Sequence, residues 1–202
     1  SVQARIISSE NNLSIGFINN DQYNETSTTL PTTGEWITLQ NVKDNNGFDG
    51  VPLLKTTVLS KQNTSINKTL KIELQYNETI EPLNYYHYLD NETEFRTKWT
   101  ESANRYGVIE SDTLLLVVPF TDMRYMTNYY NNGFKSLDQF LEYYQKKKKK
   151  MDEYIGLDFN PEKITDQNVR TKYLVRANVH GVGAAYYAGD HIGVNNSSMA
   201  SF

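Results

Sequence analysis

The sequence predicts an α+β fold in which an N-terminal antiparallel β-sandwich over residues 1–90 precedes a mixed α/β unit over residues 91–202. Two observations lead to this division. In the first part, short runs rich in Val, Ile, Leu and Thr alternate with polar turns, as they do in sandwich domains. In the second part, apolar residues recur at helical spacing on either side of one nearly continuous apolar run.

Five runs in the first part are predicted to be strands. They cover residues 4–8, 13–18, 35–39, 51–59 and 69–76. In the last of them Leu70, Ile72 and Leu74 alternate with polar residues, which is the period of a strand with one solvent-facing side. Turn-forming residues such as Asn19-Asn20-Asp21 separate the runs. Several short strands at this spacing favour an antiparallel sandwich.

Two helices are predicted in the second part. Residues 90–94 offer N-cap side chains and an acidic first turn, and Phe95 and Trp99 follow at helical spacing, so a first helix is expected to run up to Gly107. The longest helix is predicted over residues 136–156, between the N-cap Ser136 and the stop signal Gly156. Its apolar stripe comprises Phe140, Leu141, Tyr144, Met151 and Ile155.

Two further strands are predicted around the second helix. Residues 113–118 form a nearly continuous apolar run closed by Pro119, which is typical of a strand buried on both faces. Residues 173–179 form the other predicted strand. The chain then closes with a segment over residues 181–194 that is rich in Gly, Ala and Tyr.

The charge and composition of the chain argue against several classes of binding partner and site. The formal net charge is −4, which gives no general attraction to nucleic acid or to an anionic membrane. No stretch reaches the roughly 18–20 apolar residues that a membrane-spanning helix needs. We therefore expect neither nucleic acid binding nor membrane insertion. The chain has no cysteine, which excludes disulfides, thiolate zinc sites and cysteine nucleophiles.

Two local motifs have competing interpretations. The five lysines at residues 146–150 could bind a polyanion or form a solvated helix face. The solvated face is favoured, because five successive residues point all round a helix and cations near its C-terminus complement the dipole. The segment Gly181-Val182-Gly183 superficially resembles a dinucleotide-binding turn, but Tyr186 stands at the third glycine position and no helical pattern follows.

The candidate site residues lie near the end of the chain. His180 and His191 are the only histidines in the second half, and Asp190 adjoins His191. A metal centre, a substrate contact and a structural role all stay open, although the spacing matches no compact metal motif. The pair Tyr186-Tyr187 could stack on a sugar ring or pack in the core, and packing is favoured.

The sequence contains neither a nucleophilic triad nor a metallopeptidase motif. No Gly-x-Ser-x-Gly turn occurs, no Ser has a neighbouring His with an orienting acid, and there is no His-Glu-x-x-His. The residues themselves therefore predict no catalytic residue and no metal ligand in this chain.

From Phe95 onward the order of features resembles the enhancin-like zinc metallopeptidases, which comprise viral enhancins and their mucin-degrading bacterial and eukaryotic relatives. The segments that carry the resemblance are Phe95 with Lys98-Trp99, and residues 110–119, 154–157, 176–179 and 183–193. Upstream, residues 31–39 loosely resemble the Thr-Gly segment that opens the β-sandwich of that family. The similarity thus spans residues 31–202 and is densest in the second half.

This resemblance implies a β-sandwich followed by the first, mixed α/β part of a gluzincin-like catalytic domain. It implies a secreted or cell-surface enzyme that hydrolyses glycoproteins such as mucins, with zinc held by a His-Glu-x-x-His helix and a downstream Glu. Residues 1–202 would end before that motif, so the chain alone is expected to be inactive and to bind no zinc. Tyr187, Asp190 and His191 would contact substrate, with residues 189–194 forming a strand edge for an extended peptide.

Two other interpretations compete with this one. The chain could be a non-catalytic carbohydrate-binding or adhesion module whose sandwich and Tyr-rich strands bind the ligand. It could also be a structural piece left by proteolysis, which would expose apolar surface of an incomplete domain.

Overall fold

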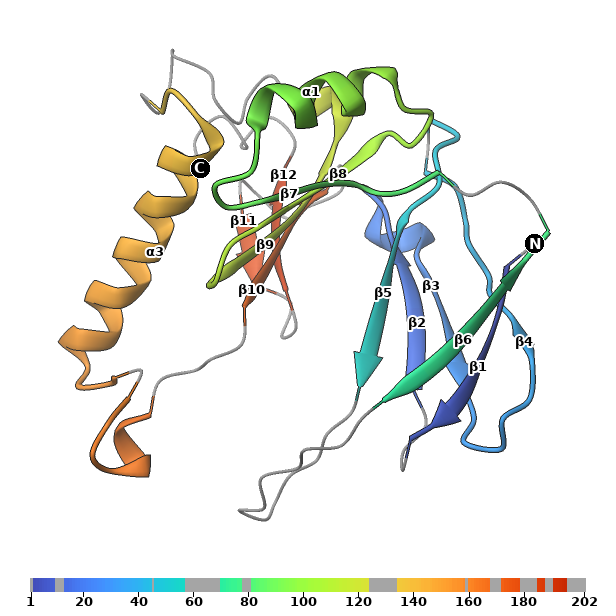
Figure 1. The fold of residues 1–202 in the computed structure, drawn as a ribbon, viewed down its shortest axis with the longest axis horizontal. Helices are drawn as coiled ribbons and strands as arrows, with labels where there is room; N and C mark the ends of the chain where they lie inside the picture. The colour runs from blue at the N-terminus through green and yellow to red at the C-terminus, as the bar shows by residue number, and fades with distance from the viewer. Residues whose placement is uncertain are drawn as a thin grey trace. The chain divides into compact units, whose positions relative to one another are not determined.

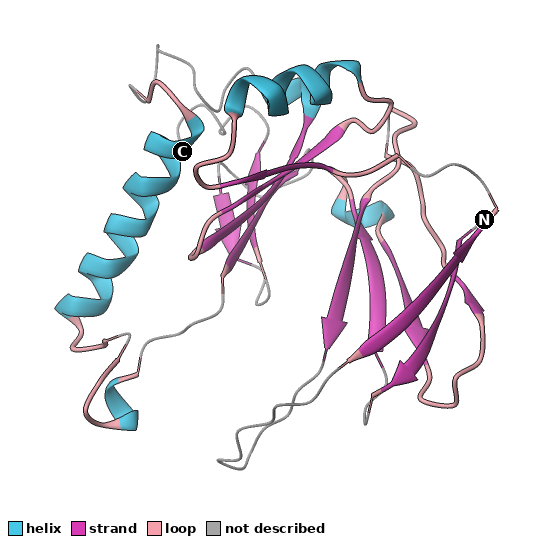
Figure 2. Cartoon of the chain, viewed as in Figure 1, coloured by secondary structure: helices cyan, strands magenta, loops and turns pink. Residues whose placement is uncertain are grey.

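The computed structural model describes residues 2–9, 13–44, 46–56, 70–77, 81–123, 134–158, 160–167, 172–178, 185–187 and 191–195. The chain divides into two compact units, Ser1–Pro82 and Leu83–Phe202 (Figure 1). The described residues form three sheets and two α-helices (Figure 2), so the predicted α+β class is confirmed.

The first unit contains two three-stranded antiparallel sheets. In one sheet the order is β4 (Ile37–Thr38), β1 (Val2–Ser8) and β6 (Lys71–Tyr76). In the other it is β3 (Thr26–Leu30), β2 (Leu13–Ile18) and β5 (Val51–Thr56). A short 3-10 helix, η1 (Gln22–Asn24), joins β2 to β3.

The two sheets of the first unit share one hydrophobic cluster. Its buried members come from β1, β2 and β3 and are Ala4, Ile6, Leu13, Ile15, Phe17 and Leu30. Ile72 of β6 and Leu54 of β5 pack against this cluster, so every one of the longer strands contributes to it. Strand β3 was not predicted, because its Thr-Ser-Thr-Thr-Leu sequence carries almost no apolar alternation.

The second unit is built on a six-stranded mixed sheet with the order β11-β12-β10-β9-β8-β7. The strands are β7 (Asn84–His87), β8 (Tyr106–Glu110), β9 (Leu114–Pro119), β10 (Tyr173–Asn178), β11 (Ala185–Tyr187) and β12 (Ile192–Asn195). Strands β7 and β8 are parallel, as are β9, β10 and β12. The pairs β8-β9 and β11-β12 are antiparallel. Strand β9 is thus the predicted apolar run, and it occupies the middle of the sheet.

Two helices pack against this sheet, and local sequence signals define their ends. Helix α1 (Glu92–Glu101) begins after Asn91, whose side chain accepts a hydrogen bond from the backbone N–H of Glu94. Helix α3 (Leu137–Tyr154) begins after Ser136, which caps it in the same way. The chain leaves α3 through Gly156 at a φ of 79°, a conformation that favours glycine.

The expected end of the first helix was wrong. Helix α1 ends at Glu101, and Gly107 lies inside β8. The glycine is needed there for close approach, because a Cβ atom at this position would lie 2.8 Å from the indole of Trp99. Gly107 therefore marks packing between a helix and a strand rather than a helix stop.

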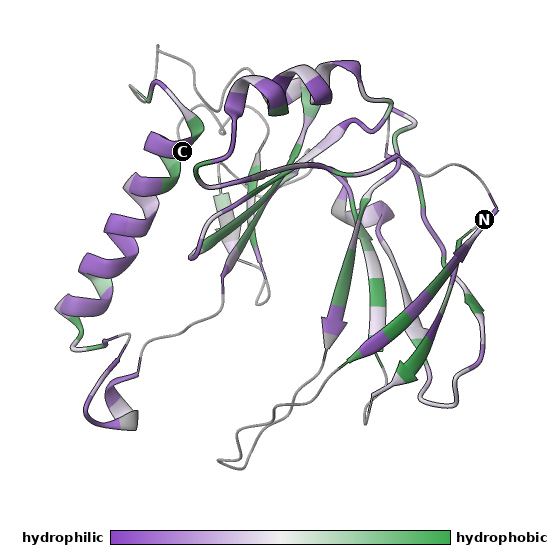
Figure 3. Cartoon of the chain, viewed as in Figure 1, coloured by the Kyte–Doolittle hydropathy of each residue, from purple (hydrophilic) through white to green (hydrophobic). Residues whose placement is uncertain are grey.

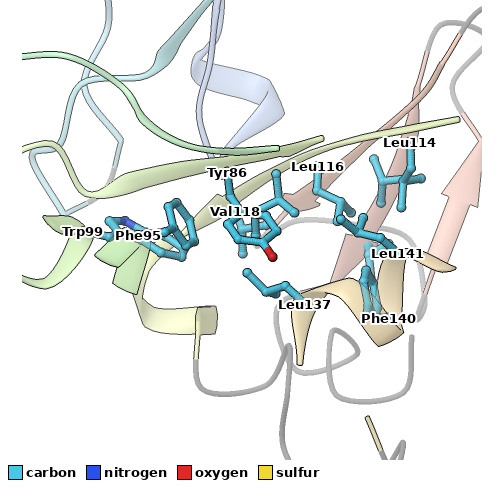
Figure 4. Packing of buried hydrophobic residues seen from close by; sticks show 12 residues of the cluster. Tyr86, Phe95, Trp99, Leu114, Leu116, Val118, Leu137, Phe140 and Leu141 are labelled. Atoms are coloured by element: carbon cyan, nitrogen blue, oxygen red, sulfur yellow. The ribbon is translucent and has the colours of Figure 1, made fainter. Parts of the chain in front are cut away.

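Both helices contribute buried apolar residues to one cluster with the sheet (Figure 4). Phe95 and Trp99 come from α1, and Leu137, Phe140 and Leu141 come from α3. The sheet contributes residues that share one face by register, namely Tyr86, Ile109, Leu114, Leu116, Val118, Val175 and Val194. A single core thus joins α1, α3 and five of the strands.

The second half of α3 extends beyond this core. Figure 3 shows mostly hydrophilic residues along α3, and the predicted stripe positions Met151 and Ile155 are 69% and 64% exposed. The apolar stripe was therefore correct for Phe140 and Leu141 and wrong for Met151 and Ile155. Helical spacing identifies residues on one face but not how far the neighbouring sheet reaches.

The division between the units falls between Pro82 and Leu83, whereas the sequence placed a domain boundary at residue 90. The difference comes from β7, which pairs in parallel with β8 and so belongs to the second sheet. None of the described helices has the length and hydrophobicity that crossing a bilayer requires.

Replacing Gly107 with Ala should destabilise the second unit by about 1–3 kcal/mol, because the new methyl group would overlap Trp99. The measurement is the urea midpoint followed by Trp99 fluorescence in a Trp36→Phe background. Gly16→Ala is the control, since the nearest atom to a Cβ there is 3.6 Å away. An unchanged midpoint for Gly107→Ala would contradict the packing described here.

Candidate functional site

The end of the second sheet is formed by β11, which pairs with β12 on one side and with no other strand of the described residues. Strand β12 lies between β10 and β11 and is paired on both sides. The expectation that residues 189–194 form an edge was therefore wrong. The edge is the preceding segment, Ala185–Tyr187.

Tyr187 is the last residue of β11 and is 75% exposed. It pairs with Ile192, which in turn pairs with Val175 of the sheet core. Because directly paired residues point to the same face of a sheet, Tyr187 lies on the face that carries the helices. Its ring is thus presented to solvent by a strand that the core holds in place.

His191 lies at the same end of the β11-β12 pair as Tyr187. It directly precedes β12, is half-buried, and its Nε2 atom is buried. Asp190 and His180 lie outside the described residues. Tyr187 and His191, two of the three residues predicted to contact substrate, therefore lie at the same end of the edge, as their closeness in sequence requires.

The chemistry available at this edge is backbone pairing. A strand with one unpaired side presents N–H and C=O groups to which an extended peptide can add as a further strand. The exposed ring of Tyr187 would lie beside such a peptide. The edge is short, so such a peptide would gain only a few hydrogen bonds from β11 itself.

The described residues do not form a metal site. No three side chains of His, Asp or Glu among them lie close enough together to hold an ion. The arrangement therefore does not fit a bound zinc within the described part of the chain, and no catalytic step is assigned to its residues.

A second group of polar residues lies on the opposite face of the same sheet. The carboxylate of Glu110, at the end of β8, accepts hydrogen bonds from the Tyr85 hydroxyl and the Lys172 ammonium. His87 pairs with Glu110 across the β7-β8 ladder. Sequence reasoning missed this cluster, because Lys172 lies 62 residues from Glu110 and nothing in the local sequence joins them.

The partners of Glu110 set its protonation and that of Tyr85. Partial burial raises the pKa of the Glu110 carboxyl, but the hydrogen bonds from Lys172 and Tyr85 outweigh burial and hold this pKa below its ordinary value. Burial, followed by the hydrogen bond to Glu110, raises the pKa of Tyr85 to about 12. Glu110 is therefore an anion, and Tyr85 a neutral donor to it, at neutral pH.

Most of the lysine run is engaged within α3. Lys146, Lys148 and Lys149 form ion pairs with Glu142, Asp152 and Glu153, each four residues away. The ammonium of Lys147 lies 4.4 Å from the centre of the Tyr143 ring. Lys146, Lys147, Lys149 and Lys150 are exposed, as a solvated face requires, whereas the paired side chains of Lys148 and Asp152 are only 10% and 14% exposed.

Of the comparisons with known proteins, only the one with solved structures found similar proteins. No family model matches the sequence, and no curated protein sequence is significantly similar to it. The ZmpB metallopeptidase from Clostridium perfringens matches with a TM-score of 0.68 and 13% identity, over 100% of this chain and 43% of its own. The M60 catalytic domain of ZmpC from the same organism, in complex with the sialyl T antigen, matches with a TM-score of 0.66 and 10% identity, over 97% and 41%.

A metallopeptidase from Bacteroides thetaiotaomicron matches with a TM-score of 0.62 and 10% identity, over 98% of this chain and 32% of its own. The fold resembles that of M60-like metallopeptidase catalytic domains. These neighbours are M60-like (enhancin-like) zinc metallopeptidase domains, the family to which the sequence was likened above. At such low identities the likeness is one of fold. The chain spans about two fifths of the length of the first two structures.

Lys172→Met should raise the pKa of the Glu110 carboxyl, because it removes the strongest interaction that lowers this pKa. A carboxyl group whose pKa is lower in the folded state than in the unfolded state stabilises the fold. This stabilisation is complete above the unfolded-state pKa and is lost as pH falls through the folded-state pKa. The unfolding free energy of the wild type should therefore fall more steeply with acidification than that of the variant. Carboxyl NMR titration of Glu110 checks the shift, and Lys150→Met, in the lysine run, is the control.

Proposed function

We propose that this chain is part of a secreted or cell-surface zinc metallopeptidase that hydrolyses glycoproteins such as mucins. In this proposal the first unit is a β-sandwich and the second is the first, mixed α/β part of a gluzincin-like catalytic domain. Support comes from the fold likeness to M60 catalytic domains over nearly the whole chain, at a TM-score of 0.66 to 0.68. One of those domains is bound to the sialyl T antigen.

The observation that carries the proposal is the antiparallel edge strand β11, which a buried sheet holds in place. We infer that an extended segment of substrate pairs with the outer edge of β11. Tyr187 would then pack against a substrate side chain or sugar, because its ring is exposed at the end of this edge. His191 and Asp190, which follow in the connection to β12, would complete the contact.

Zinc chemistry belongs to the whole enzyme in this proposal. A bound zinc ion would polarise the scissile carbonyl and lower the pKa of an attacking water. We assign neither a zinc ligand nor a general base to the described residues, and we propose that the 202-residue chain alone is inactive. Its contribution is to bind and orient the substrate.

The alternative proposal is a carbohydrate-binding or adhesion module. The observation that favours it is the exposure of several tyrosine rings on the second unit, including Tyr85, Tyr173 and Tyr187. Such rings can stack on sugar faces. Two results together would favour this alternative. The isolated chain would bind mucin-type glycans, and the full gene product would cleave no glycoprotein even with zinc.

The test of the peptidase proposal is cleavage of a mucin-type glycoprotein by the full-length gene product loaded with zinc. Chelation should abolish cleavage and added zinc should restore it. Tyr187→Ala should lower kcat/KM by about tenfold, the loss of one substrate contact. Tyr154→Ala, which removes an even more exposed tyrosine from α3, is the control and should have no effect.

Two outcomes would contradict the proposal. If the zinc-loaded protein cleaves no glycoprotein, the peptidase function itself is contradicted. Equal kcat/KM for Tyr187→Ala and the wild type would leave the enzyme intact but remove the role of the β11 edge.

A further inference from the structure

We propose that two copies of this chain associate through the outer edge of β6, which joins their β4-β1-β6 sheets into one continuous antiparallel sheet. Within the described residues β6 pairs with β1 on one side and with no strand on the other. The backbone N–H and C=O groups on its outer side can therefore bond to another strand. This surface belongs to the first unit and is independent of the peptidase proposal.

Apolar side chains on β6 are far more exposed than their neighbours in β1. Leu74 and Tyr76 are each 54% exposed, whereas Ala4, the cross-strand partner of Leu74, is completely buried. Both lie on the same face as Ile72, which packs against the core cluster, because alternate residues of a strand share a face. The apolar face of the sheet thus continues to its edge, where a further strand would extend it.

The opposite face of β6 carries complementary charges. Glu73 accepts a hydrogen bond from Arg5 Nε at 2.7 Å and pairs with Arg5 Nη2 at 2.5 Å, both through Oε2. Its Oε1 has no partner among the residues that the structure describes. Lys71 is exposed and has no ion pair or hydrogen bond from its side chain within the described residues. Each copy therefore offers one ammonium and one carboxylate oxygen on the same face of its edge strand.

A twofold axis that passes through Ile72, perpendicular to the joined sheet, aligns the charged and apolar residues of the two β6 strands. Ile72 then lies opposite Ile72 of the second copy, Lys71 lies opposite Glu73, and Leu70 lies opposite Leu74. The dimer contains the Lys71–Glu73 pair twice, and directly opposed unlike charges stabilise antiparallel strands. An axis through Lys71 or through Glu73 would instead place like charges opposite each other. The charge pattern therefore selects the register centred on Ile72.

Sedimentation equilibrium of the 202-residue chain over a concentration series tests the proposal. The unmodified chain should form dimers as its concentration rises. Lys71→Glu places one carboxylate opposite each Glu73, and Glu73→Lys places one ammonium group opposite each Lys71. Each variant should therefore dimerise at least about tenfold more weakly. An equimolar mixture of the two variants re-forms both unlike pairs and should give heterodimers of the original affinity.

Control variants test whether the dimer forms through the β6 edge and not through another surface. Tyr154→Lys changes an exposed apolar residue of α3 and should leave the dimer affinity unchanged. Because Glu73→Lys also removes the contact with Arg5, thermal unfolding must show that it is folded. If it is not, the graded series Lys71, Lys71→Gln and Lys71→Glu should weaken the dimer in that order. A monomer at every concentration, a dimer insensitive to Lys71→Glu, or failure of the mixture to associate would overturn the proposal.

Discussion

Strand β9 is buried on both of its faces, and the second unit is organised around it. Leu116 and Val118 point into the cluster that holds α1 and α3, whereas Val117 is buried on the other face. A slip of one residue would move every side chain of the strand to the wrong face. The register of β9 with β8 on one side and β10 on the other is therefore fixed by burial.

The same register determines where the candidate site lies. Leu116 of β9 pairs with Val175 of β10, Val175 pairs with Ile192 of β12, and Ile192 pairs with Tyr187 of β11. Each step keeps the residues on the face that the helices cover. An exposed tyrosine at the edge is thus positioned by a buried strand in the middle of the sheet, so the proposed binding edge would be held by the sheet rather than by a loop.

Signals that are local in sequence predicted the corresponding structure well. Ser136 and Gly156 bound the longest helix as expected, because capping depends on residues within one turn. Features that depend on the order of strands were not predicted. The contact of Lys172 with Glu110 has no local signal, since it joins residues 62 apart in the chain. The edge position of β11 follows from the insertion of β12 between β10 and β11, and no pattern within these short strands indicates that order. The exposure of Met151 was missed for the same reason, because it depends on where the sheet ends.

The peptidase function proposed for this chain requires a zinc-binding helix with a His-Glu-x-x-His motif, and residues 1–202 contain no such motif. The most direct measurement is the sequence that the source gene encodes after Phe202. We expect a His-Glu-x-x-His motif on a helix in that sequence, with a further Glu downstream, because the two imidazoles and these carboxylates complete a zinc peptidase site. A reading frame that ends at Phe202, or that continues without this motif, would contradict the peptidase proposal.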